Sequence, residues 1–174
     1  TRSDRDWSSD VCSSDLHFAR PKEPQALPTQ LNDIVQYCCD LSRVHLRKAN
    51  IEVVLELANN LPLITMDFGQ ISQVVMNLVL NAIEAMPNGG RLIIKTKYPP
   101  DSSAVLLEVA DTGKGILEED KDRVFDPFFT RKSDGTGLGL SISRQILEKH
   151  GAYIELDSAP GLGAIFRVVF NIAG

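Results

Sequence analysis

The sequence has no long apolar run and no concentration of basic residues. No stretch approaches the roughly 20 apolar residues that a membrane-spanning helix needs, and no signal peptide is visible. The net charge is −5, from 18 Lys and Arg against 23 Asp and Glu, without any positive patch for phosphate backbones. We therefore expect no nucleic-acid partner, no membrane contact by this chain, and a cytoplasmic location.

Cysteine is scarce as well. Cys12, Cys38 and Cys39 are odd in number and lack the spacing of a metal site, which is typical of reduced thiols in a cytosolic protein. The 174 residues are 43% hydrophobic, which suits one globular domain with an adequate core. Thr1–Leu16 is rich in Ser and Asp and shows no periodicity. It resembles translated sequencing-adapter read-through, so we expect residues 1–16 to be non-native and disordered.

Two asparagines one helical turn apart are the first chemical signal. Gln70–Met86 contains no Pro or Gly and is followed by Pro87, so it is predicted to be a helix. Asn77 and Asn81 fall on one polar stripe of this otherwise apolar helix. Solvent-facing stripes usually carry Lys, Glu and Arg, which are better helix formers than Asn. The pair therefore indicates a lined cavity, and amide oxygens suit Mg²⁺ together with phosphate oxygens and waters.

An acidic residue ends the next apolar run. Ala104–Ala110 is predicted to be a buried strand, and Asp111 follows it, with Gly113 and Gly115 close behind. Glycines here let the backbone approach a planar ligand or adopt a positive φ. The Asp111 carboxylate can accept hydrogen bonds from an exocyclic amine such as that of adenine. Taken alone, these residues favour an ordinary Asp-Gly turn over a ligand site.

Three glycines precede the last predicted helix, Ser141–His150. Gly135, Gly137 and Gly139 lie in the sequence GTGLGL. Backbone N–H groups at a helix start can face phosphate oxygens, assisted by the helix dipole. The spacing matches neither a Walker A loop nor GxGxxG. Leu138 argues against a flexible linker, because linkers are usually polar.

The remaining elements follow from periodicity and turn residues. Leu31–Asn50 is predicted to be an amphipathic helix with Thr29 as its N-cap, and Asp67 is expected to cap the helix that carries the asparagines. His150 is expected to interact with the dipole of its own helix, with Gly151 ending that helix. A single helical turn is expected at Glu118–Val124. The expected extended segments are Ile51–Leu57, Leu63–Met66, Arg91–Tyr98, Tyr153–Asp157 and Ala164–Ile172.

Four short segments occur together and in a recognisable order: NLVLNAIEAM, DTGKGI, FDPFFT and GTGLGL. From Pro28 to Phe170 the chain is similar to the catalytic ATP-binding domain of sensor histidine kinases of two-component systems, a GHKL-type domain. It looks most similar to the nitrogen-regulatory branch of that family. The resemblance implies a Bergerat fold, an α/β (α+β) two-layer sandwich whose mixed, mostly antiparallel sheet has helices on one face. It also implies ATP and Mg²⁺ as ligands and residues 29–174 as the catalytic domain.

The resemblance assigns roles to individual residues. Asn77 and Asn81 belong to the N box, and Asn81 is the expected direct ligand of Mg²⁺. Asp111 is expected to bind the adenine amine, and Lys132 to reach the phosphates. Asn77, Asn81 and Lys132 are the expected catalytic residues, acting by positioning and charge neutralisation. The full set expected at the nucleotide is Asn77, Asn81, Asp111, Gly113, Gly115, Ile116, Phe125, Lys132, Gly135, Thr136, Gly137, Leu138 and Gly139.

Two charged residues depart from the family pattern. Arg131 stands where many relatives have Thr, and the simplest interpretation is an exposed surface cation. Glu84 stands where other branches have a cation near the phosphates. An acid there would repel phosphate, so the role considered for it is support of the metal through a water. Phe125, Phe128 and Phe129 form the F box, which is expected to hinge a lid over the nucleotide.

The resemblance implies transfer of the γ-phosphoryl group to a histidine on a phosphoacceptor and dimerisation domain, with a response regulator downstream. None of His17, His45 and His150 lies in a phosphoacceptor context, so we expect that domain to be missing. Residues 17–28 are expected to be the end of a dimerisation helix and a linker. The fragment is then expected to be monomeric and weakly active alone.

Three alternatives share this pocket. One is a serine kinase of the anti-sigma type with the same fold, and another is a binding module that uses nucleotide only as a switch. The third is an ATP-hydrolysing machine of the topoisomerase, mismatch-repair or chaperone kind. Such machines carry a Glu at the position of Asn77 to activate water, and Asn cannot take that proton, so this alternative is the least favoured.

Overall fold

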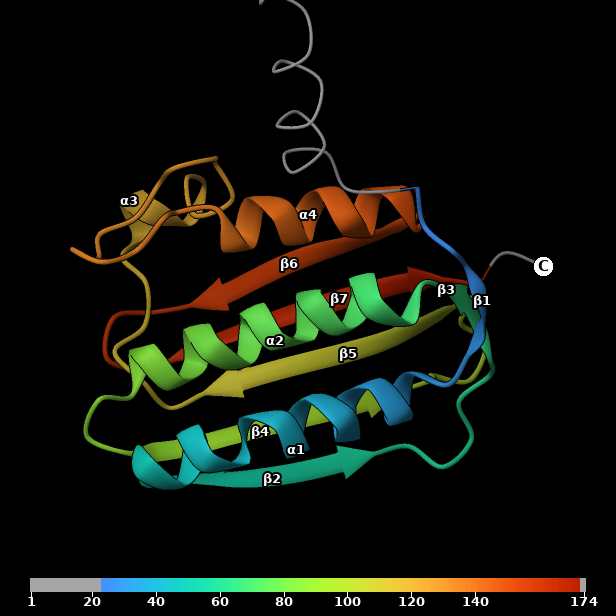
Figure 1. Cartoon of the computed structure of the whole chain (residues 1–174), viewed down its shortest axis with the longest axis horizontal. Coiled ribbons are helices and arrows are strands. Elements are labelled where there is room, and N and C mark those ends of the chain that lie inside the picture. The colour runs from blue at the N-terminus through green and yellow to red at the C-terminus, as the bar shows by residue number, and fades with distance from the viewer. Residues whose placement is uncertain (1–22, 173–174) are drawn as a thin grey trace, which may run out of the picture.

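Three helices cover one face of a five-stranded sheet (Figure 1). The computed structural model describes residues 23–172. The expectations for residues 1–16 and 17–22 therefore lie outside the described residues. Within residues 23–172, no helix combines the length and the hydrophobicity that crossing a bilayer requires.

The sheet is mixed and mostly antiparallel, as predicted. Its strands follow the spatial order β2 (Ile51–Leu57), β4 (Gly90–Lys97), β5 (Ala104–Asp111), β7 (Ala164–Asn171) and β6 (Ala152–Ser158). The pair β2–β4 is parallel, and the other three pairs are antiparallel. In the β5–β7 pair, Asp111 lies opposite Ala164, so the candidate adenine-binding residue ends its strand beside the start of β7.

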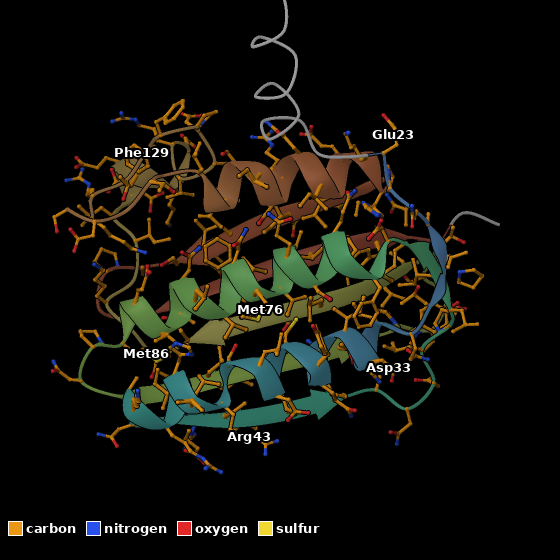
Figure 2. All side chains as sticks on the ribbon, in the orientation of Figure 1. Glu23, Asp33, Arg43, Met76, Met86 and Phe129 are labelled. Carbon is orange, nitrogen blue, oxygen red and sulfur yellow. The ribbon has the colours of Figure 1, made fainter. Side chains whose placement is uncertain are left out.

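The helices bury one apolar stripe each against the sheet. They are α1 (Leu31–Lys48), α2 (Phe68–Ala85) and α4 (Gly139–Lys149), with a single turn α3 (Glu118–Lys121) before α4. Buried residues of α2 recur at helical spacing, at Ile71, Val74, Val75, Leu78, Val79 and Ala82. Met76 lies between α1 and α2 (Figure 2), where its sulfur accepts from Ser42 Oγ at 3.4 Å. The opposite, polar side of α2 is thereby directed towards α4.

A small second sheet was not predicted. β1 (Leu27–Thr29) pairs antiparallel with β3 (Ile64–Met66) beside the start of α1. The expected N-cap role of Thr29 is wrong, because Thr29 belongs to β1 and its hydroxyl donates to Leu27 O at 2.8 Å. Gln30 is the N-cap residue of α1, and its side chain makes no capping hydrogen bond.

Asp67 joins three segments at the start of α2. Its carboxylate accepts from Gln70 N at 2.9 Å, which confirms the predicted cap, and from Gln25 N at 2.7 Å. Its own N–H donates to His150 Nε2 at 3.1 Å, so His150 links the end of α4 to α2 in addition to lying at a helix end. Burial opposes ionisation of Asp67, but these backbone N–H groups outweigh burial and lower its pKa. Gly151 adopts φ +64° after α4, as expected of a C′ glycine.

The face of the sheet away from the helices carries a row of alternating charge. Glu56, Lys95, Glu108, Arg167 and Glu155 occupy neighbouring register positions on all five strands. The distances are 2.7 Å from Lys95 to Glu56, 3.2 Å from Arg167 to Glu108 and 3.5 Å from Arg167 to Glu155. Such a row suits a hydrated surface. The residues predicted at the nucleotide lie instead at one end of the sheet.

Candidate nucleotide site

A cavity of about 500 Å³ opens at the end of the sheet where β5 finishes and α4 begins. Its walls come from the second half of α2, the loop after β5, α3, the segment before α4, and the start of β7. Figure 2 shows Met86, just beyond α2, and Phe129, beside α3, at this same end of the molecule. The volume is typical of cavities that hold small-molecule ligands and cofactors.

Ten of the thirteen residues expected at the nucleotide line this cavity. They are Asn77, Asn81, Asp111, Gly115, Ile116, Lys132, Gly135, Thr136, Gly137 and Gly139. Three separate segments of the sequence, residues 77–81, 111–116 and 132–139, are thus brought to one space. The fold therefore brings most of the residues predicted at the nucleotide into one cavity.

Gly113, Phe125 and Leu138 lie behind the cavity lining. A Cβ at Gly113 would come within 2.4 Å of the carbonyl oxygen of Ala85, so this glycine lets the loop pack against the end of α2. Phe125 packs edge-on against Phe166, with 6.4 Å between the ring centroids, and Phe166 is part of the lining. Leu138 is the N-cap residue of α4. These three residues support the cavity and do not form its surface.

Asp111 presents a carboxylate in an almost dry setting. The residue is 8% exposed, and its Oδ1 accepts from Gly113 N at 2.8 Å. Burial raises the pKa of Asp111, while the N–H groups of Gly113 and Ala164 oppose that rise. A buried acceptor of this kind discriminates strongly between ligands with and without a matching hydrogen-bond donor. A ligand that cannot donate to it leaves the buried carboxylate unpaired.

The loop after β5 is clamped onto the turn between β6 and β7. Ser158 Oγ accepts from Ile116 N at 2.9 Å and donates to Gly163 O at 2.6 Å. Gly163 has φ +77°, and a Cβ there would come within 1.9 Å of the carbonyl oxygen of Asp111. A side chain at Gly115, whose φ is +72°, would similarly strike the backbone of this turn at 2.0 Å. Backbone contact therefore determines where the Asp111 carboxylate points.

The two asparagines of α2 differ in their hydrogen bonds. Asn77 Nδ2 donates to Gly139 O at 3.0 Å and to Ser143 Oγ at 3.1 Å, which ties α2 to the first turn of α4. Asn81 lies one turn further along the same cavity wall. In residues 23–172, no side chain or backbone group forms a hydrogen bond with the Asn81 amide. Its oxygen is free for a ligand, which fits a hard cation held together with phosphate oxygens.

The F box and the glycine segment are joined through their backbones. Phe128 N donates to Gly137 O at 2.9 Å, and a Cβ at Gly137 would come within 2.4 Å of the carbonyl carbon of Phe128. Phe128 is 74% exposed, and its backbone has φ +67°. Phe129 lines the cavity, with the Arg123 guanidinium 4.6 Å from its ring centroid. The three F-box phenylalanines therefore differ in environment, since one packs behind the cavity, one faces solvent and one lines it.

Arg131 is an exposed cation, as the simplest interpretation of its sequence position expects, and it also forms two ion pairs within the segment before α4. Its guanidinium lies 2.6 Å from Glu119 Oε1 and 2.5 Å from Asp120 Oδ2. The Asp120 side chain is only 6% exposed and lines the cavity. Asp120 was missed because it lies in a run of acidic residues in which nothing distinguishes it from Glu118 and Glu119. Its burial depends on the folded position of α3.

Lys132 and Glu84 form an ion pair between the segment before α4 and the last turn of α2. Both residues line the cavity, and their side chains are 39% and 53% exposed. The sequence raised both residues as charged groups near phosphate but contained no signal that they pair, because they lie 48 positions apart. Other wall residues that were missed, such as Ala164 and Phe166, follow from the strand register beside Asp111.

The fold and this pocket define a nucleotide-binding sandwich domain, and comparison with known proteins agrees. The family model described as histidine kinase-, DNA gyrase B-, and HSP90-like ATPase matches residues 66–174. The sensor histidine kinase ZraS of Salmonella typhi is 34% identical over 158 residues, which cover 91% of this chain and 34% of that kinase. The chain thus spans about a third of the length of this curated relative.

Solved structures show the same domain. The catalytic domain of histidine kinase ThkA is 35% identical with a TM-score of 0.75, covering 84% of this chain and 95% of that chain. ThkA in complex with the response regulator protein TrrA gives 30% identity and a TM-score of 0.76, covering 91% and 45%. Full-length ShkA in complex with AMPPNP gives 26% identity and a TM-score of 0.77, covering 90% and 34%.

The chain belongs to the family of histidine kinase-, DNA gyrase B-, and HSP90-like ATPases, and within it to the catalytic ATP-binding domains of histidine kinases. This confirms the fold class and the family that the four sequence segments indicated.

Proposed function

We propose that this domain binds Mg·ATP and presents the γ-phosphoryl group to a histidine on a separate phosphoacceptor and dimerisation domain in two-component signalling. The observation that carries the proposal is one cavity lined by a buried carboxylate, Asp111, by the Asn81 amide and by the glycines before α4. The family model, named for ATPases, and the AMPPNP complex of ShkA support the choice of nucleotide.

Different residues contact the adenine, the metal and the phosphates of the nucleotide. Asp111 accepts from the adenine amine, and Asn81 supplies an amide oxygen to Mg²⁺. The backbone of Gly135–Gly139 and the ammonium of Lys132 face the phosphates. Bound Mg²⁺ supplies charge neutralisation at the phosphate oxygens. The nucleophile is the incoming imidazole of the partner domain, so this chain is required only to position and neutralise.

The environment of Asn77 is consistent with low turnover in the absence of that partner. Its amide donates to Gly139 O and Ser143 Oγ, and an amide cannot accept the proton of an attacking water. We therefore expect very little steady-state ATP hydrolysis by the chain alone. Robust hydrolysis by purified protein, lost with Asn77→Ala, would contradict this expectation and favour an ATP-driven machine of the same fold.

The proposal extends to organisation and partners. Residues 29–174 form the catalytic unit, residues 17–28 belong to the connection with the dimerisation domain, although Leu27 and Pro28 already pair with β3, and residues 1–16 are not native. The partners are the phosphoacceptor and dimerisation domain of the parent kinase and a downstream response regulator, as ThkA has in TrrA. The chain by itself is monomeric and cytoplasmic.

Calorimetry on wild type and Asp111→Asn, with and without Mg²⁺, tests the proposal. Wild type is expected to bind ATP, and Asp111→Asn to weaken binding by at least about tenfold, because the one side-chain oxygen that Asn keeps already accepts from Gly113 N and none is left for the adenine amine. Asp157→Asn, an exposed change on β6, is the matched control and should bind like wild type. A wild-type chain that is folded by circular dichroism yet binds no adenine nucleotide would refute the proposal. Phosphoryl transfer to a phosphoacceptor domain is the second step.

A further inference from the structure

The entrance of the cavity is bridged by two opposite charges. Glu84 belongs to the last turn of α2, three residues beyond Asn81, and Lys132 lies between the F box and Gly135. The Lys132 ammonium contacts the Glu84 carboxylate, and both side chains line the cavity. The cation assigned to the phosphates is therefore already occupied by a protein carboxylate.

This ion pair is easily exchanged. The side chains of Lys132 and Glu84 are 39% and 53% exposed, and ion pairs at such exposure contribute little to stability. A polyphosphate carries several negative charges and three or more acceptor oxygens, so it competes well with one carboxylate for the same ammonium. A neutral nucleoside offers Lys132 no replacement for the carboxylate.

The backbone around Lys132 is held by contacts that do not involve the Lys132 side chain. Lys132 N donates to Thr130 Oγ1 at 3.0 Å, and a Cβ at Gly135 would come within 2.6 Å of that hydroxyl. The preceding residue, Arg131, is anchored to the buried carboxylate of Asp120. Lys132 can therefore exchange partners by rotation of its long side chain, from a backbone that neighbouring contacts hold.

We infer that Glu84 is a specificity-determining residue, which holds Lys132 until a ligand with phosphates at the cavity entrance displaces it. This inference rests on the proposed function, because it takes the occupant of the cavity to be an adenine nucleotide. Glu84 thereby lowers the affinity for every phosphorylated nucleotide that reaches Lys132 and leaves the affinity for adenosine unchanged. Discrimination between nucleotides then depends on whether their phosphates reach Lys132.

Calorimetry with Mg·ATP and with adenosine tests the inference on wild type, Glu84→Gln, Lys132→Gln and the double variant. Glu84→Gln should bind Mg·ATP about two- to fivefold more tightly, the range expected when an exposed ion pair no longer competes. Its affinity for adenosine should match wild type. Lys132→Gln should weaken Mg·ATP binding, and adding Glu84→Gln to it should restore nothing.

The double variant separates a competing ion pair from simple repulsion. If Glu84→Gln tightens ATP binding equally in the Lys132→Gln background, Glu84 acts by repelling phosphate and the inference is wrong. If Glu84→Gln weakens binding only with Mg²⁺ present, Glu84 supports the metal and the inference is equally wrong. Glu119→Gln, which removes an exposed carboxylate from Arg131 on the same segment, is the matched control and should leave ATP affinity unchanged.

The outcomes also distinguish this inference from the proposed function. A folded wild-type chain that binds neither adenosine nor ATP removes the basis of both. A wild-type chain that binds ATP, with Glu84→Gln indistinguishable from it, overturns the role of Glu84 alone.

Discussion

The two sides of the cavity are held by different forces. One side, the core wall, comprises the ends of β5 and α2 with the β6–β7 turn, where Gly163 passes within atomic contact of the Asp111 backbone. The other side, the lid segment of residues 117–138, is joined to α2 by the exposed ion pair Lys132–Glu84, while Arg131–Asp120 links two parts of the segment itself. Buried backbone contacts do not respond to salt, whereas exposed charges are screened and exchange partners. The wall is thus built to keep its shape, and the lid segment to change its contacts.

The largest expected effect is on the core wall. Gly163→Ala should reduce the free energy of unfolding by about 3 kcal/mol or more, because its Cβ would lie 1.9 Å from the Asp111 carbonyl oxygen at φ +77°. Gly161→Ala is the matched control, since Gly161 has φ +78° with nothing within 4 Å, and should lose about 1 kcal/mol. Urea denaturation measures both, and equal losses would mean that backbone conformation alone, without close packing, explains Gly163.

A smaller effect is expected on the lid segment. Arg131→Gln leaves the Asp120 carboxylate, 6% exposed, without its charged partner, which should loosen the folded position of α3. Amide hydrogen exchange should rise in residues 117–138 and stay unchanged in β5 and β7. Glu119 is 70% exposed, so Glu119→Gln should change exchange very little. Faster exchange spread evenly over the sheet would show that the two sides are not independent.

The sequence predicts the core wall better than the lid segment, for a physical reason. Periodicity and strand ends depend on local residues, so α2, β5 and the position of Asp111 could be predicted from the sequence. The pairs Arg131–Asp120 and Lys132–Glu84 join residues 11 and 48 positions apart, and charge alone does not specify a partner. An acidic run such as Glu118–Asp120 is typical of a solvated turn until the fold buries one of its members.

The small sheet was missed for a related reason. Leu27–Thr29 is three residues long and contains Pro28, which disfavours a strand, and its partner β3 lies more than 30 positions away. Likewise, the hydrogen bond between Asp67 and His150 joins residues 83 positions apart, and the periodicity of neither helix predicts it. The cap at Asp67 was predictable because its partner, Gln70, is a near neighbour.

Asp67 offers a further test at the far end of α2. Asp67→Ala removes the cap and should cost about 1 kcal/mol at about pH 7. The pKa of Asp67 is lowered in the folded state, so its contribution is present above the unfolded pKa and disappears as the pH falls through the folded pKa. The free energies of unfolding of the two proteins, measured by urea denaturation, should therefore approach each other as the pH falls below the ordinary aspartate pKa of about 3.9. A difference that persists there would mean that the lost side chain matters through packing and not through its charge.

The smallest expected effect, and one of opposite sign, concerns Asp111. Its pKa is raised by burial, so in the window between its unfolded and folded values the native state binds more protons, and stability falls as the pH rises. An Asn at this position still accepts from Gly113 N but carries no charge to desolvate. Asp111→Asn should therefore be as stable as wild type at about pH 4 and equal or slightly more stable at about pH 7.

Unfolding free energies of wild type and Asp111→Asn at the two pH values, beside their ATP affinities, would complete the comparison. A variant that folds at least as well yet loses nucleotide binding would show that the core wall keeps a destabilising charge for recognition. If Asp111→Asn instead lost stability at about pH 7, as Asp67→Ala should, the carboxylate would be structural. The rigid wall would then owe its shape to Asp111 as well as to Gly163.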